Sequence, residues 1–133
     1  ENSKTEPQSL HGIMHLTREL LLGAHFNDLC ILRPTLIYGQ EDPHNGYGPN
    51  KFIRLAKKNF QIKLFGQGEE LRDHVWIEDV STLILNAICY NSSGILNIAT
   101  GRVYSLYDIA KKIIKILNSK SVIMTSKSGI IST

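Results

Sequence analysis

The run DLCILR at residues 28–33 is the stretch that decides the fold class. Its apolar residues are consecutive rather than alternating, which is typical of a strand that is covered on both faces of a parallel sheet. Pro34 follows directly and is expected to end the pairing, because proline has no N–H to donate. A second run of this kind, ILNIAT, occupies residues 95–100.

Helical patterns surround these two runs. Apolar residues recur at helical spacing over residues 10–24, 50–59, 79–90 and 106–118. Polar residues that can accept hydrogen bonds from a first helical turn precede or open three of these segments, namely Ser9, Asn50 and Ser105. Two apolar strands separated by helices indicate part of a parallel α/β sheet, and two strands alone cannot cover both faces of each other. The pattern therefore predicts one side of a larger fold.

In the segment 62–77 the apolar residues recur at every second position rather than at helical spacing. Ile62 and Leu64, and then Val75 and Ile77, alternate with other residues on either side of a Gly-Gln-Gly turn at 66–68. This pattern predicts a β-hairpin.

Composition excludes several classes of protein. The 133 residues are 42% hydrophobic, enough for one core. The net charge of +3 is too mild to indicate a nucleic-acid partner. No apolar run approaches the roughly 20 residues of a membrane span, and no secretory leader is visible. Cys30 and Cys89 lie in apolar stretches, which favours buried free thiols in a reducing, cytoplasmic compartment.

Four blocks of sequence, in this order, resemble the C-terminal half of an extended short-chain dehydrogenase/reductase, in the NAD-dependent sugar-nucleotide epimerase/dehydratase family. They are PQSLHGIMHLTRE at 7–19, ILRPTLIYGQ at 31–40, IKLFGQGEELRDHVWIEDV at 62–80 and LNIATG at 96–101. The third block is the most specific, because its Arg-Asp-x-Val-x-x-x-Asp pattern is long and unusual. The resemblance implies the C-terminal part of a Rossmann-like parallel sheet together with a small substrate-binding subdomain.

The resemblance also implies what the chain lacks. The family's N-terminal half has a Gly-rich turn that holds the pyrophosphate of NAD. Gly46-Tyr47-Gly48 and Gly66-Gln67-Gly68 lack the third glycine and the strand-to-helix setting of that turn. Residues 1–133 are therefore expected to be a fragment with the active-site helix, the last parallel strands and the substrate-binding subdomain. NAD or NADP would be bound mainly by the absent half.

The first block should carry the chemistry. Family members use Tyr-x-x-x-Lys on a helix, where the phenolate takes a proton from a sugar hydroxyl as hydride leaves for NAD. Here His11 stands at the tyrosine position and His15 at the lysine position. Four hypotheses stay open for this pair: an altered acid/base pair, a degenerate site, two ligands of a metal site, or plain surface histidines. The sequence predicts no metal, because no glutamate lies between the histidines and no third ligand is evident.

The second block implies contacts with the cofactor. Pro34, Thr35 and Leu36 correspond to the strand end that faces the nicotinamide, although many relatives have asparagine where this chain has Leu36. The alternative for Pro34 is a simple strand terminator.

The remaining blocks imply contacts with substrate. Arg72 corresponds to the family's diphosphate-binding arginine, and its alternative is an ion pair with Glu70 or Asp73. Ile62 and Leu64 would flank the nucleotide base, or else belong to an ordinary core. Backbone N–H groups at Asn50 and Lys51 could hold a phosphate, or Asn50 could be a plain helix cap.

Taken together, the resemblance predicts the substrate-binding portion of an NAD(P)-dependent nucleotide-sugar epimerase or dehydratase. The alternative is a degenerate or truncated domain that binds a nucleotide-diphosphate sugar without turnover. The expected assembly is a homodimer formed through the 10–24 helix. The chain on its own is expected to self-associate or to be marginally stable, because the 28–33 strand would lose its neighbour.

Overall fold

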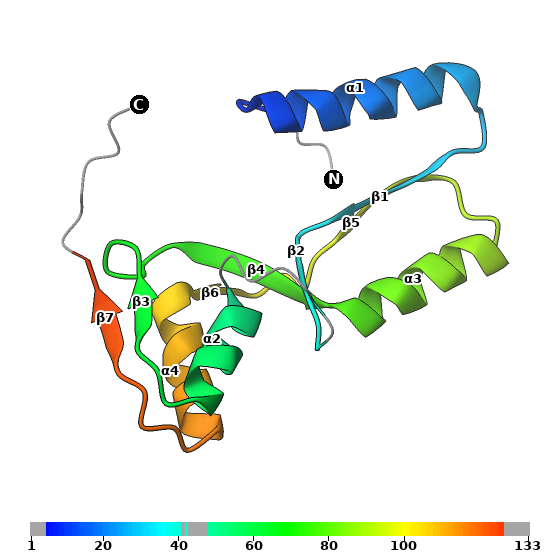
Figure 1. Ribbon diagram of the computed structural model, residues 1–133. Coiled ribbons are helices and arrows are strands. Elements are labelled where there is room, and N and C mark those ends of the chain that lie inside the picture. Colours follow the sequence, from blue (N-terminus) through cyan, green and yellow to red (C-terminus); the bar gives the residue numbers. More distant parts are fainter. Residues whose placement is uncertain (1–4, 41, 43–47, 127–133) are drawn as a thin grey trace. The chain divides into compact units, whose positions relative to one another are not determined.

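The computed structural model describes residues 5–40, 42 and 48–126 (Figure 1). Along these ranges the elements follow the order α1 (Leu10–His25), β1 (Cys30–Pro34), β2 (Leu36–Tyr38), α2 (Pro49–Lys57), β3 (Ile62–Leu64), β4 (Leu71–Trp76), α3 (Ile77–Cys89), β5 (Gly94–Ile98), β6 (Val103–Ser105), α4 (Leu106–Ile116) and β7 (Ile123–Thr125). The chain divides into two compact units. Unit 1 comprises described residues up to 33 together with 82–97, and unit 2 comprises 34–81 and 98 onward.

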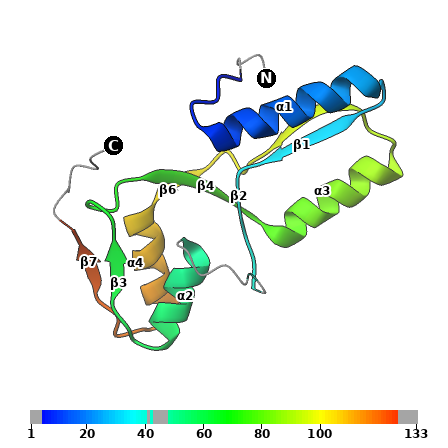
Figure 2. The ribbon, with the colours of Figure 1, turned by 45° about the horizontal axis from the view of Figure 1, so that its top comes forward.

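Unit 1 is built on the pairing of β1 with β5. The N–H of Gly94 donates to the carbonyl of Leu29 at 2.9 Å where this pairing begins. In both views of the ribbon, β1 and β5 run between α1 and the part of α3 that belongs to this unit (Figures 1 and 2). The predicted cap of α1 is confirmed, since the Oγ of Ser9 accepts a hydrogen bond from the N–H of Gly12 at 3.1 Å.

Unit 2 contains the buried core of the described chain. Its sheet has the order β2-β4-β6, in which β4 is parallel to β2 and antiparallel to β6. A second, two-stranded parallel sheet joins β3 to β7. Helices α2 and α4 pack on each other beside these strands (Figure 2). The core cluster consists of Phe52, Ala56, Ile62, Leu64, Leu106 and Ala110.

The predicted fold class is confirmed, but the hairpin within it is wrong. Strands β3 and β4 flank the Gly66-Gln67-Gly68 turn as expected, yet they do not pair with each other. Ile62 and Leu64 instead lie opposite Ile123 and Thr125 of β7. The alternation of apolar with other residues indicates a half-buried strand. It does not indicate which other strand is the partner. The partner is supplied by β7, about 60 residues further along the chain.

Two further expectations need correction. Helix α2 begins one residue early: its N-cap is Gly48, at φ 86°, with Pro49 as the first helical residue. Asn50 therefore lies inside the first turn and is not the cap. Cys89 is exposed and Cys30 is half-buried, so neither thiol is fully buried. Within the described ranges, no helix is long and apolar enough to cross a bilayer.

Candidate functional site

Asp73 of β4 joins three of the four sequence blocks within unit 2. Its carboxylate accepts hydrogen bonds from the N–H and hydroxyl of Thr100, at 3.2 and 2.7 Å, and from the N–H of Gly101 at 2.8 Å. Its backbone carbonyl accepts the hydroxyl of Thr35 at 3.0 Å. The residues that follow β1 and β5 are thus held to β4 by one side chain and one carbonyl.

The hydrogen bonds to Asp73 also determine its ionisation. Burial acts to raise the pKa of the Asp73 carboxyl, but the hydrogen bonds from Thr100 and Gly101 outweigh burial and hold that pKa below its ordinary value. A carboxylate that accepts several N–H and O–H donors is favoured in its charged form. Asp73 therefore stays ionised at neutral pH and fixes the position of β4.

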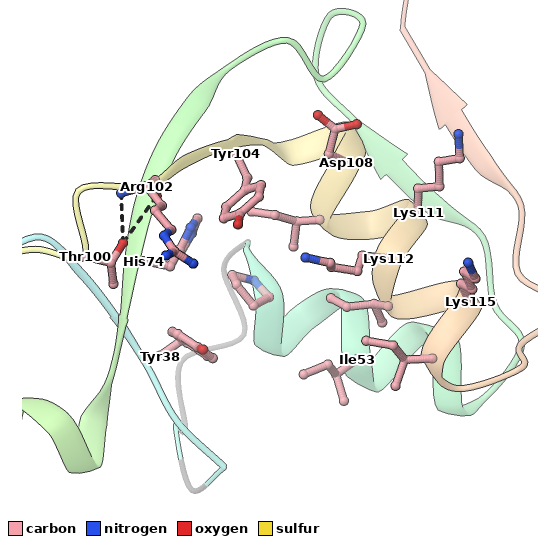
Figure 3. Close-up of a pocket in the computed structure, with 14 residues that line it drawn as sticks. Tyr38, Ile53, His74, Thr100, Arg102, Tyr104, Asp108, Lys111, Lys112 and Lys115 are labelled. Atoms are coloured by element: carbon pink, nitrogen blue, oxygen red, sulfur yellow. Dashed lines mark hydrogen bonds between the residues drawn. The ribbon is translucent and has the colours of Figure 1, made fainter.

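An open cavity of about 1010 Å³ lies in unit 2 beside β4 (Figure 3). Its lining comes from the end of β2, from β4, β6, α2 and α4, and from the segment between β5 and β6. The residues are Tyr38, Pro49, Ile53, His74, Thr100, Arg102, Tyr104, Asp108, Ile109, Lys111, Lys112, Ile113, Lys115 and Ile116. Cationic side chains predominate among its charged groups. A cavity of this size can hold a ligand larger than a single sugar.

The charged groups around the cavity differ in direction. Lys112 points into the space between α4 and β4, whereas Lys111 and Lys115 point away from it (Figure 3). The Lys112 Nζ lies 4.9 Å from the centroid of the Tyr104 ring, within range of a cation–π contact. The Asp108 carboxylate is already engaged, because it accepts the hydroxyl of Ser105 at 2.7 Å. The cavity is therefore suited to an anionic ligand.

His74 places an unsatisfied polar atom at this cavity. Its Nδ1 is buried and has no hydrogen-bond partner among the described residues. Burial lowers the pKa of the His74 imidazole, and the neighbouring Asp73 carboxylate only partly opposes that effect. The Tyr38 ring stands edge-on to it, with centroids 6.3 Å apart. A neutral imidazole that lines a cavity can donate to, or accept from, a bound ligand.

Arg72 lies next to the cavity without lining it. Successive side chains of a strand alternate in direction, so Arg72 shares a face of β4 with His74. Its partner across the sheet is Tyr104, which does line the cavity. The guanidinium is half-exposed and forms an ion pair with Glu70. The structure therefore contains the ion pair that the sequence offered as the alternative to a diphosphate contact.

The other predicted substrate residues have structural roles. Ile62 is fully buried and Leu64 is 5% exposed, so both belong to the core. The side-chain amide of Asn50 donates to the Asp42 carboxylate at 2.7 Å, and Lys51 follows it in the first turn of α2. These contacts fix the start of α2.

The predicted cofactor residues lie where β1 gives way to β2. Pro34 is the last residue of β1, and Leu36 opens β2 opposite His74. Between them, the N–H of Thr35 donates to the carbonyl of Ile98 at 3.0 Å. Thr35 thus bonds to residues of both β4 and β5.

The predicted catalytic pair lies in unit 1. His11 and His15 are exposed on α1, and their Nε2 atoms are 3.1 Å apart. One turn further along, the Glu19 carboxylate accepts two hydrogen bonds from the Nε of Arg33, at 3.0 and 3.1 Å, and pairs with its NH2. The hydrogen bonds from the Arg33 guanidinium lower the pKa of the Glu19 carboxyl, and they outweigh the opposing effect of burial. These contacts tie α1 to β1.

Sequence reasoning missed the lining of the cavity. His74 lies inside the most specific block, and Arg102 and Tyr104 follow the LNIATG block at alternating positions. That alternation, which puts two ligand-capable side chains on one face, was the available signal. Lys111 and Lys112 of α4 are both exposed, and both line the cavity.

The comparisons with known proteins identify the family. The model of the NAD dependent epimerase/dehydratase family matches residues 1–99. The chain belongs to that family. A protein of Methanocaldococcus jannaschii named "Putative UDP-glucose 4-epimerase" is 32% identical over 120 residues, which cover 84% of this chain and 39% of that protein. This family member thus spans about two-fifths of the length of that relative.

Solved structures of the family have the same fold. A UDP-glucose 4-epimerase of Thermotoga maritima, solved with UDP-glucose, matches 95% of this chain and 43% of its own, with a TM-score of 0.80 and 26% identity. A UDP-N-acetylglucosamine 4-epimerase of Methanobrevibacter ruminantium, in complex with UDP-N-acetylmuramic acid, matches 98% of this chain and 44% of its own. Its TM-score is 0.84, at 20% identity. These matches support the Rossmann-like fold class.

Proposed function

We propose that this chain is the substrate-binding portion of an NAD(P)-dependent nucleotide-sugar epimerase or dehydratase. The whole enzyme would oxidise a sugar hydroxyl transiently, rearrange the keto sugar and return the hydride. The observation that carries the proposal is the cationic, aromatic cavity beside the β4 strand that Asp73 anchors. Membership of the family and the UDP-glucose bound to the Thermotoga maritima relative support the choice of ligand.

The cavity offers a contact for each part of such a ligand. The rings of Tyr38 and Tyr104 can pack against a nucleotide base or a sugar. Arg102 and Lys112 can neutralise the diphosphate, and Arg72 can join them once it leaves Glu70. The imidazole of His74, which also lines the cavity, can bind a sugar hydroxyl or a phosphate oxygen.

The cofactor part of the proposal rests on the residues after β1. Family members bind a dinucleotide at the carboxyl ends of parallel strands. Thr35 lies at such an end, and its two hydrogen bonds hold the backbone there. We propose that Pro34, Thr35 and Leu36 lie against the nicotinamide, with most of the NAD contacts made by a Gly-rich half that these 133 residues do not contain. We also propose that α1 pairs two copies of the enzyme, because its exposed leucines would then be covered.

A second candidate function is binding without turnover. The observation that favours it is the replacement of tyrosine and lysine by His11 and His15, which leaves no side chain with the reach of a phenol or the constant charge of an ammonium group at these positions. In this case the cavity would still bind a nucleotide-diphosphate sugar.

Calorimetric titration of the chain with UDP-glucose tests the binding function. The variants Arg102→Gln and Lys112→Gln should each weaken binding by about ten- to a hundredfold, because each removes a charge-assisted contact worth roughly 1.5–3 kcal/mol. Lys58→Gln, which removes an equal charge away from the cavity, should leave binding unchanged. Absence of binding in the unmodified chain, or equal weakening by all three variants, would contradict the proposal.

Two more variants test the position of Arg72. Arg72→Gln should weaken UDP-glucose binding, and Glu70→Gln should strengthen it by freeing the guanidinium. If neither variant changes affinity, Arg72 has no part in binding. Formation of UDP-galactose from UDP-glucose, measured with added NAD in a protein that carries both halves, then separates an enzyme from a binding domain.

A further inference from the structure

His11 and His15 take no part in the proposed binding site, and their side chains lie close together. The two residues are one helical turn apart on α1, and both side chains are exposed. Their Nε2 atoms lie 3.1 Å apart, with ring centroids at 4.5 Å and ring planes at 79°. The two rings are therefore hydrogen-bonded to each other through their Nε2 atoms, one donating and the other accepting.

This separation matches the separation that a shared metal ion imposes. Zinc binds imidazole nitrogen at about 2.0–2.1 Å. Two nitrogens at that distance from one ion, and 3.1 Å from each other, subtend an angle of about 95–100° at the ion. The angle lies between those of octahedral and tetrahedral coordination, and the ion would take the place of the proton in the hydrogen bond between the two rings.

We propose that His11 and His15 form a two-nitrogen site for a divalent transition-metal ion of the copper, nickel and zinc class. Imidazole nitrogen suits these ions, whereas magnesium and calcium prefer oxygen ligands. The inference goes beyond the proposed function, because it requires neither a nucleotide sugar nor NAD.

The surroundings of the pair define the rest of the coordination shell. Glu19 lies one turn beyond His15, but its carboxylate is held by the Arg33 guanidinium. Among the described residues, no group of three or more histidine, cysteine, aspartate or glutamate side chains could hold an ion together. The site is therefore a two-residue chelate whose remaining positions are open to water or to an exogenous oxygen ligand.

The helix itself favours chelation. The Ser9 cap stabilises the first turn of α1, which contains His11. Once one imidazole holds the ion, the second binds at a high effective concentration, which strengthens the pair by about a hundredfold or more over one histidine. Binding also crosslinks residues i and i+4, which stabilises the helical turn.

Titration of the chain with nickel ions, followed by calorimetry and by NMR of the histidine ring protons, tests the proposal. Nickel should broaden the ring signals of His11 and His15 selectively, and copper should bind more tightly than nickel or zinc. His11→Gln and His15→Gln should each weaken binding by about a hundredfold. Magnesium should produce no heat and no broadening.

His25→Gln is the matched control. It removes an imidazole from the same helix, where the His25 Nδ1 is 2.8 Å from the Leu21 carbonyl and has no histidine one turn away. This variant should bind nickel as the unmodified chain does, and circular dichroism should show equal helix content in all variants. If the double variant lacking His11 and His15 binds nickel as tightly as the unmodified chain, or if His25→Gln weakens binding equally, the proposal is overturned.

Discussion

Asp73 is the residue on which the order of unit 2 most depends. Substitution Asp73→Asn keeps the shape of the side chain, but it removes the charge and turns an NH2 group toward the donors of Thr100 and Gly101. We expect the variant to lose about 1–3 kcal/mol in free energy of unfolding. Urea denaturation measures this loss, and Asp28→Asn, at an exposed loop position, should cost less than about 0.5 kcal/mol. Equal costs would show that the hydrogen bonds to Asp73 contribute little.

The pH dependence of that contribution follows from the lowered pKa. Because the folded state holds the pKa of Asp73 below its value in the unfolded chain, its stabilisation is present above the ordinary aspartate pKa and is lost as pH falls through the folded pKa. The Asp73→Asn variant should therefore approach the unmodified chain in stability at strongly acid pH.

A separate prediction concerns how His74 affects the stability of the chain at a higher pH. Burial lowers the pKa of its imidazole in the folded state, so the unfolded chain binds the proton more readily. Stability from this residue is present above the ordinary histidine pKa and is lost as pH falls through the lower folded pKa. We expect His74→Phe to flatten the decline in stability between about pH 7 and pH 5, measured by urea denaturation. His25→Phe, on exposed helix α1, should keep the decline.

At the scale of elements, the pairing of β3 with β7 makes the clearest prediction. Ile62 is fully buried and lies opposite Ile123, within the cluster formed by α2 and α4. Ile62→Ala should cost about 2–4 kcal/mol, because it removes buried methyl groups and leaves a cavity. Phe60→Ala, two residues earlier at an exposed position, should have a much smaller effect on the denaturation midpoint. A small cost at Ile62 would indicate that the core around β3 collapses to fill the space.

Elements also differ in how far the sequence predicts them. Ser9 and Ser105 were predicted as caps and are caps, because a side-chain oxygen and the N–H three residues later lie within one turn. The partner of Ile62 was not predictable in this way. Its partner lies about 60 residues further along the chain. The alternating pattern of β3 would fit β4 as a partner as well as it fits β7.

At the scale of the whole molecule, the two units differ in burial. The buried hydrophobic residues all lie in unit 2, whereas none of the described side chains of unit 1 is buried. Exposed leucines and isoleucines instead occur along α1, α3 and β5. Apolar surface of this extent is typical of an interface.

This surface predicts self-association of the chain. Sedimentation velocity at increasing concentration should show a rising average mass, because association removes apolar surface from water. Leu20→Glu and Ile88→Glu in unit 1 should reduce association, whereas Phe60→Glu in unit 2 should not. A chain that stays monomeric at all concentrations, or that responds equally to all three variants, would contradict this prediction.

The sequence by itself determined the family, the helices with their serine caps, and the two apolar strand runs. These depend on contacts within a few residues or on a fixed order of motifs. Only the tertiary structure decided that β3 pairs with β7, that Asp73 holds Thr35, Thr100 and Gly101, and that Arg72 pairs with Glu70 beside a cavity lined by His74 and Arg102. Such contacts join distant parts of the chain, and which ones form depends on how all the elements pack together.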